Sequence, residues 1–355
     1  MPATMADVAR RARVSTATVS RVLAGVGSVR PETRARIVAA AEALDYRPSA
    51  VARSLRQGTT RSLGLIITDI ENPFFPQLVR AIEEAASRAG YALLLCNAAD
   101  DPEREAGYLE LLAERRVDGV ILAVSRLGGR HREWLAQPPV PVVLVNAAAR
   151  GVRVPTVASD DRTGGRLAAE HLLRLGHQRL AALTVGPRHA AAPARLAGVR
   201  HVIAAAGVPE RHLDVVVDQP DVGGGERAAD EALDRDPRPT AIIAHNDLMA
   251  IGALRAARSR GLHVPGRLSI VGFDDIPIAA YAEPPLTTVA QDVAALGSWA
   301  VERLVERLTP AAPIDREGEA AASSEVRSWA TTGRVVVPVR LVIRGSTGRA
   351  PEGPG

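Results

Sequence analysis

The chain has 355 residues, of which 46% are hydrophobic and 24% charged, so it is long enough for two or three domains with a large apolar core. The single cysteine, Cys96, excludes an intramolecular disulfide and is expected in the core, and no zinc-binding spacing or other metal or cofactor pattern accompanies the eight histidines. No apolar stretch approaches the roughly 20 residues that cross a bilayer, and no signal segment opens the chain, so we expect a cytoplasmic protein without a membrane partner.

Positive charge is concentrated at the N-terminal end. Residues 1–61 contain eleven arginines and four carboxylates, a net charge of +7, whereas the whole chain carries +4. A basic segment attached to a slightly acidic remainder is typical of proteins in which one module binds the phosphates of nucleic acid.

Two short helices are predicted first. Thr4 and Asp7 have the spacing of a capping box, and Ser15 is placed to cap the second helix after about four residues, which predicts a helix-turn-helix. In that motif the start of the second helix contacts base edges in the major groove, and the candidates here are Ser15, Thr16, Ala17, Ser20 and Arg21. Arg suits guanine, and the methyl groups of Thr and Ala suit thymine. Periodicity alone also allows a helical hairpin without DNA function.

A third helix and a linker follow. Pro31 and Glu32 are start signals for a helix over residues 31–44. Its predicted inward stripe is Ile37, Val38, Ala41 and Leu44. In the linker, Ser49 can cap a helix over 50–56. A helix of under two turns is unstable alone in water, so we expect it to form only on binding a partner.

The order of these segments resembles the lactose-repressor (LacI/GalR) family of bacterial transcription regulators. The matching stretches are DVARRARVSTATVSRVL, PETRARIVAAAEALDYRP and SAVARSL, and the match is most similar to the purine-repressor branch. The resemblance implies a homodimer on a pseudo-palindromic DNA operator. It also implies a hinge helix in the minor groove, with Leu55 wedged between bases and Arg53 near the backbone. The chain departs from the family at Arg13, where glycine and a positive φ are usual, and at Arg30, which replaces a serine cap.

From residue 62 strands alternate with helices. Buried strands are predicted over 62–68, 91–96, 119–124 and 142–145, and a second series over 180–185, 215–217, 241–245 and 268–273. This alternation predicts an α/β core of two lobes with doubly wound parallel sheets behind the all-α helix-turn-helix head. The resemblance implies a periplasmic-binding-protein type I core in which the chain crosses between the lobes three times.

The expected domains follow from these elements. Residues 1–46 form the DNA-binding head, 47–60 the hinge and 61–345 the core. Lobe 1 takes 61–160 and 291–325, and lobe 2 takes 161–290 and 326–345. The Ala/Ser/Gly-rich segment 310–333 is expected to be a mobile loop, residues 346–355 a disordered tail, and Gly223–Gly225 a flexible helix entry.

Polar residues after strand ends predict a ligand site. The effector-binding candidates are Phe74, Asn146, Asp160, Arg195, Asn246 and Asp274. The resemblance implies that Arg195 and Asp274 hydrogen-bond the ligand and that Phe74 stacks on it, which suits a sugar, a nucleoside or a purine. Asp247 is expected to cap the helix 247–260, and Phe75 to belong to the core.

These features predict a dimeric repressor whose operator affinity a small effector controls. The sequence leaves a corepressor-activated regulator of the purine type open. It also leaves open a solute-binding protein without DNA function, or an enzyme on the same fold. Because no catalytic constellation is present, we expect no enzymatic activity.

Overall fold

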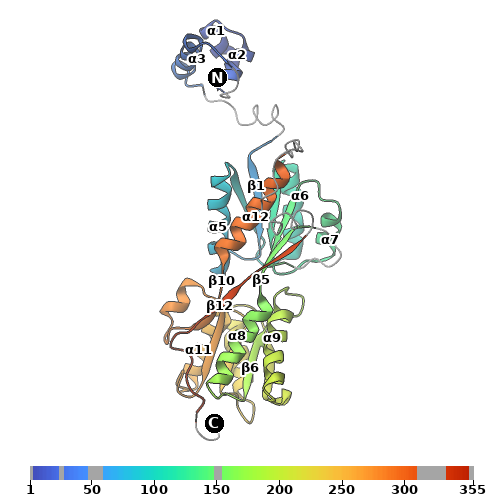
Figure 1. The fold of residues 1–355 in the computed structure, drawn as a ribbon, viewed down its shortest axis with the longest axis vertical. Coiled ribbons are helices and arrows are strands. Elements are labelled where there is room, and N and C mark those ends of the chain that lie inside the picture. The colour runs from blue at the N-terminus through green and yellow to red at the C-terminus, as the bar shows by residue number, and fades with distance from the viewer. Residues whose placement is uncertain (1–2, 24–27, 47–58, 148–153, 310–332, 352–355) are drawn as a thin grey trace, which may run out of the picture. The chain divides into compact units, whose positions relative to one another are not determined.

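The computed structural model describes residues 3–23, 28–46, 59–147, 154–309 and 333–351. The chain divides into two compact units, residues 1–61 and 62–355 (Figure 1). Among the described residues, no helix is both long enough and apolar enough to span a membrane.

The N-terminal unit contains the three predicted helices, α1 (Met5–Ala12), α2 (Thr16–Leu23) and α3 (Pro31–Ala43). The capping box is confirmed, because the Asp7 amide donates to Thr4 Oγ1 and the Thr4 amide donates to the Asp7 carboxylate. The Thr18 amide donates to Ser15 Oγ at 3.2 Å, so Ser15 caps α2 as expected. The small core consists of Val8, Ala9, Ala12, Val19, Val22, Ile37, Ala40 and Ala41.

Two local predictions for this unit are confirmed and one is wrong. Arg13 ends α1 in the left-handed region with φ of 54°, and Arg30 precedes α3 without a side-chain capping bond. Val38, which was predicted to point inward, is 41% exposed, and Ala40 is buried instead. Ile37, Ala40 and Ala41 share one face of α3 at the spacing i, i+3, i+4, and Val38 lies about 100° from Ile37, outside this face.

The second unit has two six-stranded sheets, and Figure 1 shows α5 and α12 with the first and α8, α9 and α11 with the second. The first sheet has the order β11-β5-β4-β3-β1-β2 and the second β12-β10-β9-β8-β6-β7. Among the strands of the described residues, all pairs are parallel except β10 with β12. The first sheet comprises β1 (Ser62–Ile67), β2 (Ala92–Asn97), β3 (Gly119–Ala123), β4 (Val142–Val145), β5 (Thr156–Ser159) and β11 (Arg334–Val337), with α5 (Phe74–Arg88), α6 (Pro102–Glu114), α7 (Gly129–Ala136) and α12 (Val293–Leu308).

The second sheet comprises β6 (Leu180–Thr184), β7 (Leu213–Val217), β8 (Ala241–Ala244), β9 (Ser269–Asp274), β10 (Thr287–Gln291) and β12 (Val339–Val342). Its helices are α8 (Asp161–Arg174), α9 (Ala192–Ala205), α10 (Val222–Leu233) and α11 (Asp247–Ser259). The chain crosses between the lobes after β5, after β10 and between β11 and β12. The predicted alternation and the three crossings are therefore present.

The C-terminal part differs from the prediction in two places. Strand β11 pairs with β5 in the first lobe, so the last crossing falls at Pro338 and not near residue 326. Residues 346–351 are ordered against the second lobe. There the Thr287 amide donates to Ser346 Oγ at 2.8 Å, and the Ala350 amide donates to the Leu175 carbonyl at 2.9 Å. The sequence predicted a disordered tail here because the hydrogen-bond partners of these polar residues lie far away in the chain.

Glycine contacts fix how the helices of the second lobe cross. A Cβ on Gly198 of α9 would lie 2.1 Å from the Arg162 carbonyl oxygen of α8. A Cβ on Gly225 of α10 would lie 2.2 Å from the Met249 carbonyl oxygen of α11. Gly224, whose Cβ would lie 2.3 Å from the Gln219 carbonyl oxygen, and Gly225 therefore serve close packing in the first turn of α10 and not the flexible entry that we expected, whereas Gly223 has room for a side chain.

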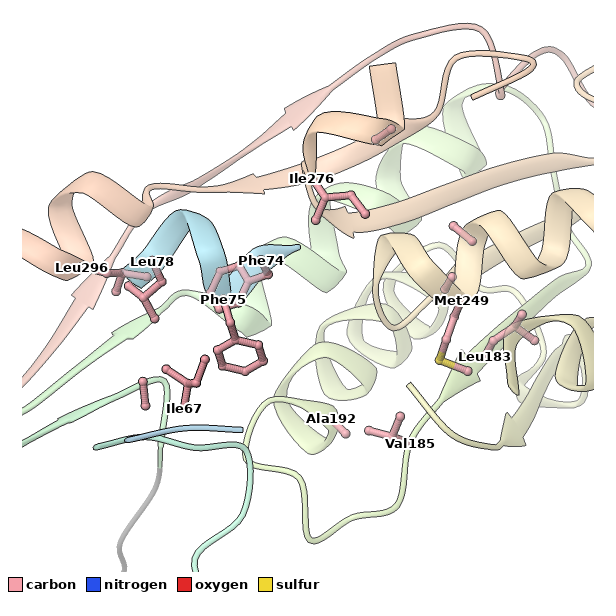
Figure 2. Packing of buried hydrophobic residues seen from close by; sticks show 14 of the residues in the cluster. Ile67, Phe74, Phe75, Leu78, Leu183, Val185, Ala192, Met249, Ile276 and Leu296 are labelled. Atoms are coloured by element: carbon pink, nitrogen blue, oxygen red, sulfur yellow. The ribbon is translucent and has the colours of Figure 1, made fainter. Parts of the chain in front are cut away.

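One apolar cluster includes residues of both lobes. Figure 2 shows Phe74, Phe75 and Leu78 of α5 near Leu296 of α12, and Met249, Leu183 and Val185 in the second lobe belong to the same cluster. Phe75 is 8% exposed and packs in this cluster as expected. Cys96 is only half-buried, because β2 is the edge strand of its sheet, where Leu95 is 44% exposed.

Candidate functional site

A cavity of about 560 Å³ lies where the carboxyl ends of the strands of the two lobes face each other. This volume is within the range of small-molecule sites. Five of the six predicted effector-binding residues line it, namely Phe74, Asn146, Arg195, Asn246 and Asp274. Asp160 does not line it. Its side chain accepts a 2.9 Å hydrogen bond from the Thr163 amide and caps α8.

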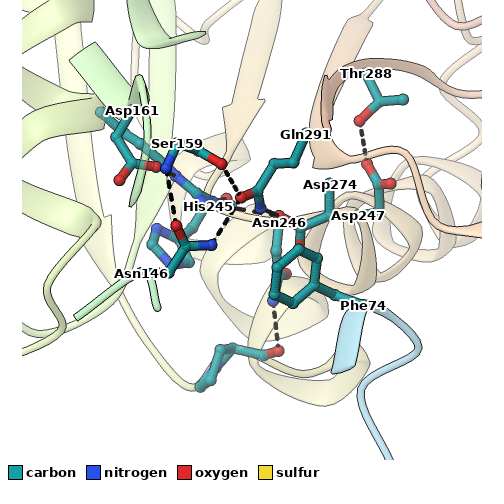
Figure 3. Close-up of polar contacts among 12 residues, drawn as sticks. Phe74, Asn146, Ser159, Asp161, His245, Asn246, Asp247, Asp274, Thr288 and Gln291 are labelled. Carbon is teal, nitrogen blue, oxygen red and sulfur yellow. Dashed lines mark hydrogen bonds and ion pairs between the residues drawn. The ribbon is translucent and has the colours of Figure 1, made fainter. Parts of the chain in front are cut away.

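A chain of side-chain hydrogen bonds crosses the cavity wall from lobe to lobe (Figure 3). Gln291 Oε1 accepts from Asn146 Nδ2 at 2.9 Å and from Ser159 Oγ at 2.6 Å. Gln291 Nε2 donates to Asp274 Oδ1 at 2.7 Å. Ser159 and Gln291 are the last residues of β5 and β10, and after each of these strands the chain crosses to the other lobe. The network therefore connects two of the crossings between the lobes to the Asp274 carboxylate of the cavity.

The guanidinium of Arg195 is held on several sides. Its Nε donates to Asp161 Oδ1 at 2.8 Å, and its Nη2 lies 3.7 Å from Asp274 Oδ1. Its Nη1 donates to the His245 carbonyl, and its Cζ lies 3.5 Å from the centroid of the Phe273 ring. The side chain is therefore fixed in one orientation, with its charge balanced by two carboxylates.

Asp274 is buried in an unusual backbone conformation. Its φ is 109°, that of Asp275 is 56°, and its side chain is 7% exposed. Burial raises the pKa of Asp274 to about 6, although the Arg195 guanidinium and the Gln291 amide lower it. Non-glycine residues in such backbone regions cost on the order of 1–3 kcal/mol and cluster at binding sites.

The Asp247 side chain holds the turn that follows β9 through buried hydrogen bonds. Its carboxylate accepts from the Ile276 amide at 2.9 Å and from Thr288 Oγ1 at 2.5 Å, and burial raises its pKa well above the usual value. The predicted capping role is wrong, since Asn246 caps α11 by accepting from the Met249 amide at 2.8 Å. Asn246 also donates to the Pro220 carbonyl at 2.9 Å.

Several residues that line the cavity were missed. They include Asp100, Ser125, His189, Asp221, His245 and Gln291, whereas Asp69, expected at the cleft because it follows the first strand, does line the cavity. Asp100, His245 and Gln291 stand at or just beyond the ends of β2, β8 and β10, so the strand-end rule would have found them had it been applied to every strand. His189 lies in the loop after β6, for which the sequence carries no such signal.

The N-terminal unit presents most of its predicted DNA-contacting residues to solvent. Ser15, Thr16, Ala17 and Arg21 are exposed on or beside α2, and Ser20 is half-buried. Arg21 Nε lies 3.5 Å from the Ala17 carbonyl, a distance too long to hold the guanidinium firmly. Arg53 and Leu55 lie outside the described residues.

Comparison with known protein families gives two matches. Residues 4–49 match the family described as bacterial regulatory proteins, lacI family. Residues 60–330 match the family described as periplasmic binding proteins and sugar binding domain of LacI family. The two matches together cover most of the chain and correspond to its two units.

Curated relatives and solved structures extend the similarity. The ribose operon repressor of Halalkalibacterium halodurans is 37% identical over 97% of this chain and 97% of its own length. The repressor PurR of Mannheimia succiniciproducens is 35% identical over 86% of this chain and 92% of its own. The lac repressor dimer bound to operator and the anti-inducer ONPF is 28% identical, with a TM-score of 0.84 over 98% of this chain and 100% of that one. A regulator from Enterococcus faecium with bound ribose is 31% identical, with a TM-score of 0.68 over 81% of this chain and 98% of that one.

Proposed function

Because the chain belongs to the lacI family of bacterial regulatory proteins, we propose that it is a dimeric repressor whose affinity for an operator is set by a small ligand held between its lobes. The observation that carries this proposal is the cavity itself, whose polar lining Gln291 joins to the segments in which the chain crosses between the lobes. A ligand that bonds Asp274 and Asn146 at once touches both lobes. It therefore favours one angle between them over another, which is the differential affinity that a population shift requires.

The proposed ligand is a sugar of about monosaccharide size. Carboxylate, amide and guanidinium groups that line the same cavity as Phe74 suit a ring bearing several hydroxyl groups. Ribose is the first ligand to test, because the repressor from Halalkalibacterium halodurans is named for the ribose operon and the Enterococcus faecium structure contains ribose. Binding is followed by calorimetry on the full chain.

DNA binding is tested on the duplex upstream of the chain's own gene. With roughly 8 phosphate contacts, the logarithm of the binding constant falls with the logarithm of salt concentration with a slope of about −7. We expect Arg21→Ala to cost about 1–3 kcal/mol and to relax discrimination at one base pair. Leu55→Gly should weaken specific binding far more than non-specific binding. A salt-independent signal would instead favour a solute-binding protein without DNA function.

A corepressor-activated regulator of the purine type is the second candidate, favoured by the similarity to PurR. The two candidates predict opposite changes in operator affinity on ligand binding, because a sugar inducer lowers this affinity whereas a purine corepressor raises it. Titrating ribose and, separately, free purine bases into the operator complex separates them. We also infer that the protein acts in the cytoplasm, where bacterial DNA lies, and that it leaves its ligand chemically unchanged, which NMR of the ligand after long incubation checks.

A further inference from the structure

We propose that the cavity selects uncharged ligands and rejects their phosphorylated or carboxylated counterparts. This inference rests on the proposed function and narrows its ligand class. It follows from the charges around the cavity, from the state of its two histidines and from the way the facing helices begin.

Carboxylates outnumber guanidiniums around the cavity. Arg195 is the only guanidinium among its described lining residues, and Arg126 stands behind Asp100. Five carboxylates line the described part of the cavity, namely Asp69, Glu71, Asp100, Asp221 and Asp274, and a sixth, Asp161, pairs with Arg195. Arg150 and Arg153 lie outside the described residues. The described residues alone therefore present an anion that enters this site with a field of its own sign.

Both guanidiniums are already paired. Arg195 bonds Asp161 at 2.8 Å and lies near Asp274, as described above. Arg126 Nη2 lies 2.7 Å from Asp100 Oδ2 and donates to the Asp100 carbonyl at 2.8 Å. Ala99 and Asp100 both have positive φ, at 53° and 57°, so the loop holds Asp100 against Arg126 in a strained conformation. Arg126 Nε has no hydrogen-bond partner among the described residues but is buried, so a phosphate would compete with Asp100 for the Nη2 of Arg126 and with Asp161 and Asp274 for Arg195.

The two histidines add no positive charge. Burial lowers the pKa of His189, and burial together with the Arg195 charge lowers the pKa of His245 well below the usual value. Nδ1 of His245 is buried without a hydrogen-bond partner in the part of the chain that the structure describes. Both imidazoles are therefore uncharged and offer no positive charge to a phosphate.

The helix N-termini at the cavity, which would ordinarily attract anions, are largely occupied by the chain's own groups. The Asp221 carboxylate caps α10 through the Gly224 amide, and Asn246 caps α11. The Phe74 amide at the start of α5 donates to Asn72. Helix α9 has no side-chain cap, but the Ala194 and Arg195 amides donate to the Ala191 carbonyl, and Pro193 has no amide hydrogen.

The test uses matched pairs of ligands on the full chain at pH 7.5 and constant ionic strength. Ribose is compared with ribose 5-phosphate, and glucose with glucose 6-phosphate, by calorimetry and thermal shift. We expect one neutral sugar to bind at least tenfold more tightly than its phosphate. A phosphate that binds as tightly as its parent overturns the inference but leaves the proposed function standing. If neither member of any pair binds, both this inference and the sugar ligand of the proposed function are wrong.

Two variants test the electrostatic cause. Asp100→Asn exposes the Arg126 guanidinium, so the preference for the neutral sugar should fall at least threefold. Glu103→Gln removes the same charge from a 74% exposed side chain outside the cavity and should leave the preference unchanged. Equal effects of both variants, or none from Asp100→Asn, overturn the explanation. If Asp100→Asn does not fold, Asp69→Asn removes a cavity charge while keeping an acceptor for the Glu71 amide.

Discussion

Replacing Asp274 with asparagine should stabilise the ligand-free protein and abolish ligand binding. Folding raises the pKa of this carboxyl from 3.8 to about 6. At about 1.4 kcal/mol per unit, ionised Asp274 costs the folded state about 3 kcal/mol at pH 7.5. Asparagine carries no charge and can still accept the bond from Gln291 Nε2, although Arg195 loses a partner. We therefore expect a net gain of about 1–2 kcal/mol, which raises Tm by roughly 2–6 °C.

The pH dependence identifies the cause. Because the folded pKa is raised, the wild type keeps this part of its stability below about pH 4 and loses it as pH rises through 6. The Tm of Asp274→Asn minus that of the wild type should therefore grow from about pH 4 to just above pH 6 and then stay constant.

The assay is scanning calorimetry without ligand, with Asp214→Asn, which removes a carboxylate from a surface ion pair, as the control. A variant that is less stable than the wild type at pH 7.5, or a difference that does not change with pH, would refute the reasoning.

Two further predictions concern stability, and denaturant unfolding of the full chain measures both. Gly198→Ala should cost at least about 2 kcal/mol because the methyl group would overlap the Arg162 carbonyl. Gly107→Ala, in a helix with open space around it, should be neutral or stabilise by up to about 1 kcal/mol. Equal costs would contradict the helix-crossing argument. Ser346→Ala removes a buried hydroxyl that bonds the Thr287 amide and the Ile270 carbonyl, and we expect a loss of about 1–3 kcal/mol. No loss would mean that the C-terminal segment does not secure the second lobe.

Much of the architecture could be predicted from local signals. Thr4 with Asp7, Ser15 and Pro31 mark helix starts through interactions that span three or four residues, and all three helices are present. The strands of the core are continuous apolar runs, because strands covered on both faces need apolar side chains throughout. The strand-end rule placed Asn146, Asn246 and Asp274 at one cavity, since parallel strands bring their carboxyl ends to the same edge, whereas Arg195 of α9 was expected there from the family resemblance.

The remaining features depend on partners far away in the sequence. Asp160 and Asp247 are both acidic residues near the start of a helix, yet only Asp160 is a cap, whereas Asp247 bonds the turn after β9. Gln291 acquires its place by meeting Asn146 and Asp274, which lie 145 and 17 residues away. Ser346 is ordered because its hydroxyl reaches two neighbouring strands of the second sheet. Composition and spacing thus determine which segments form helices and strands. The hydrogen-bond partner of each buried polar group is decided only when the lobes assemble, because a hydrogen bond depends on distance in space and not on separation along the chain.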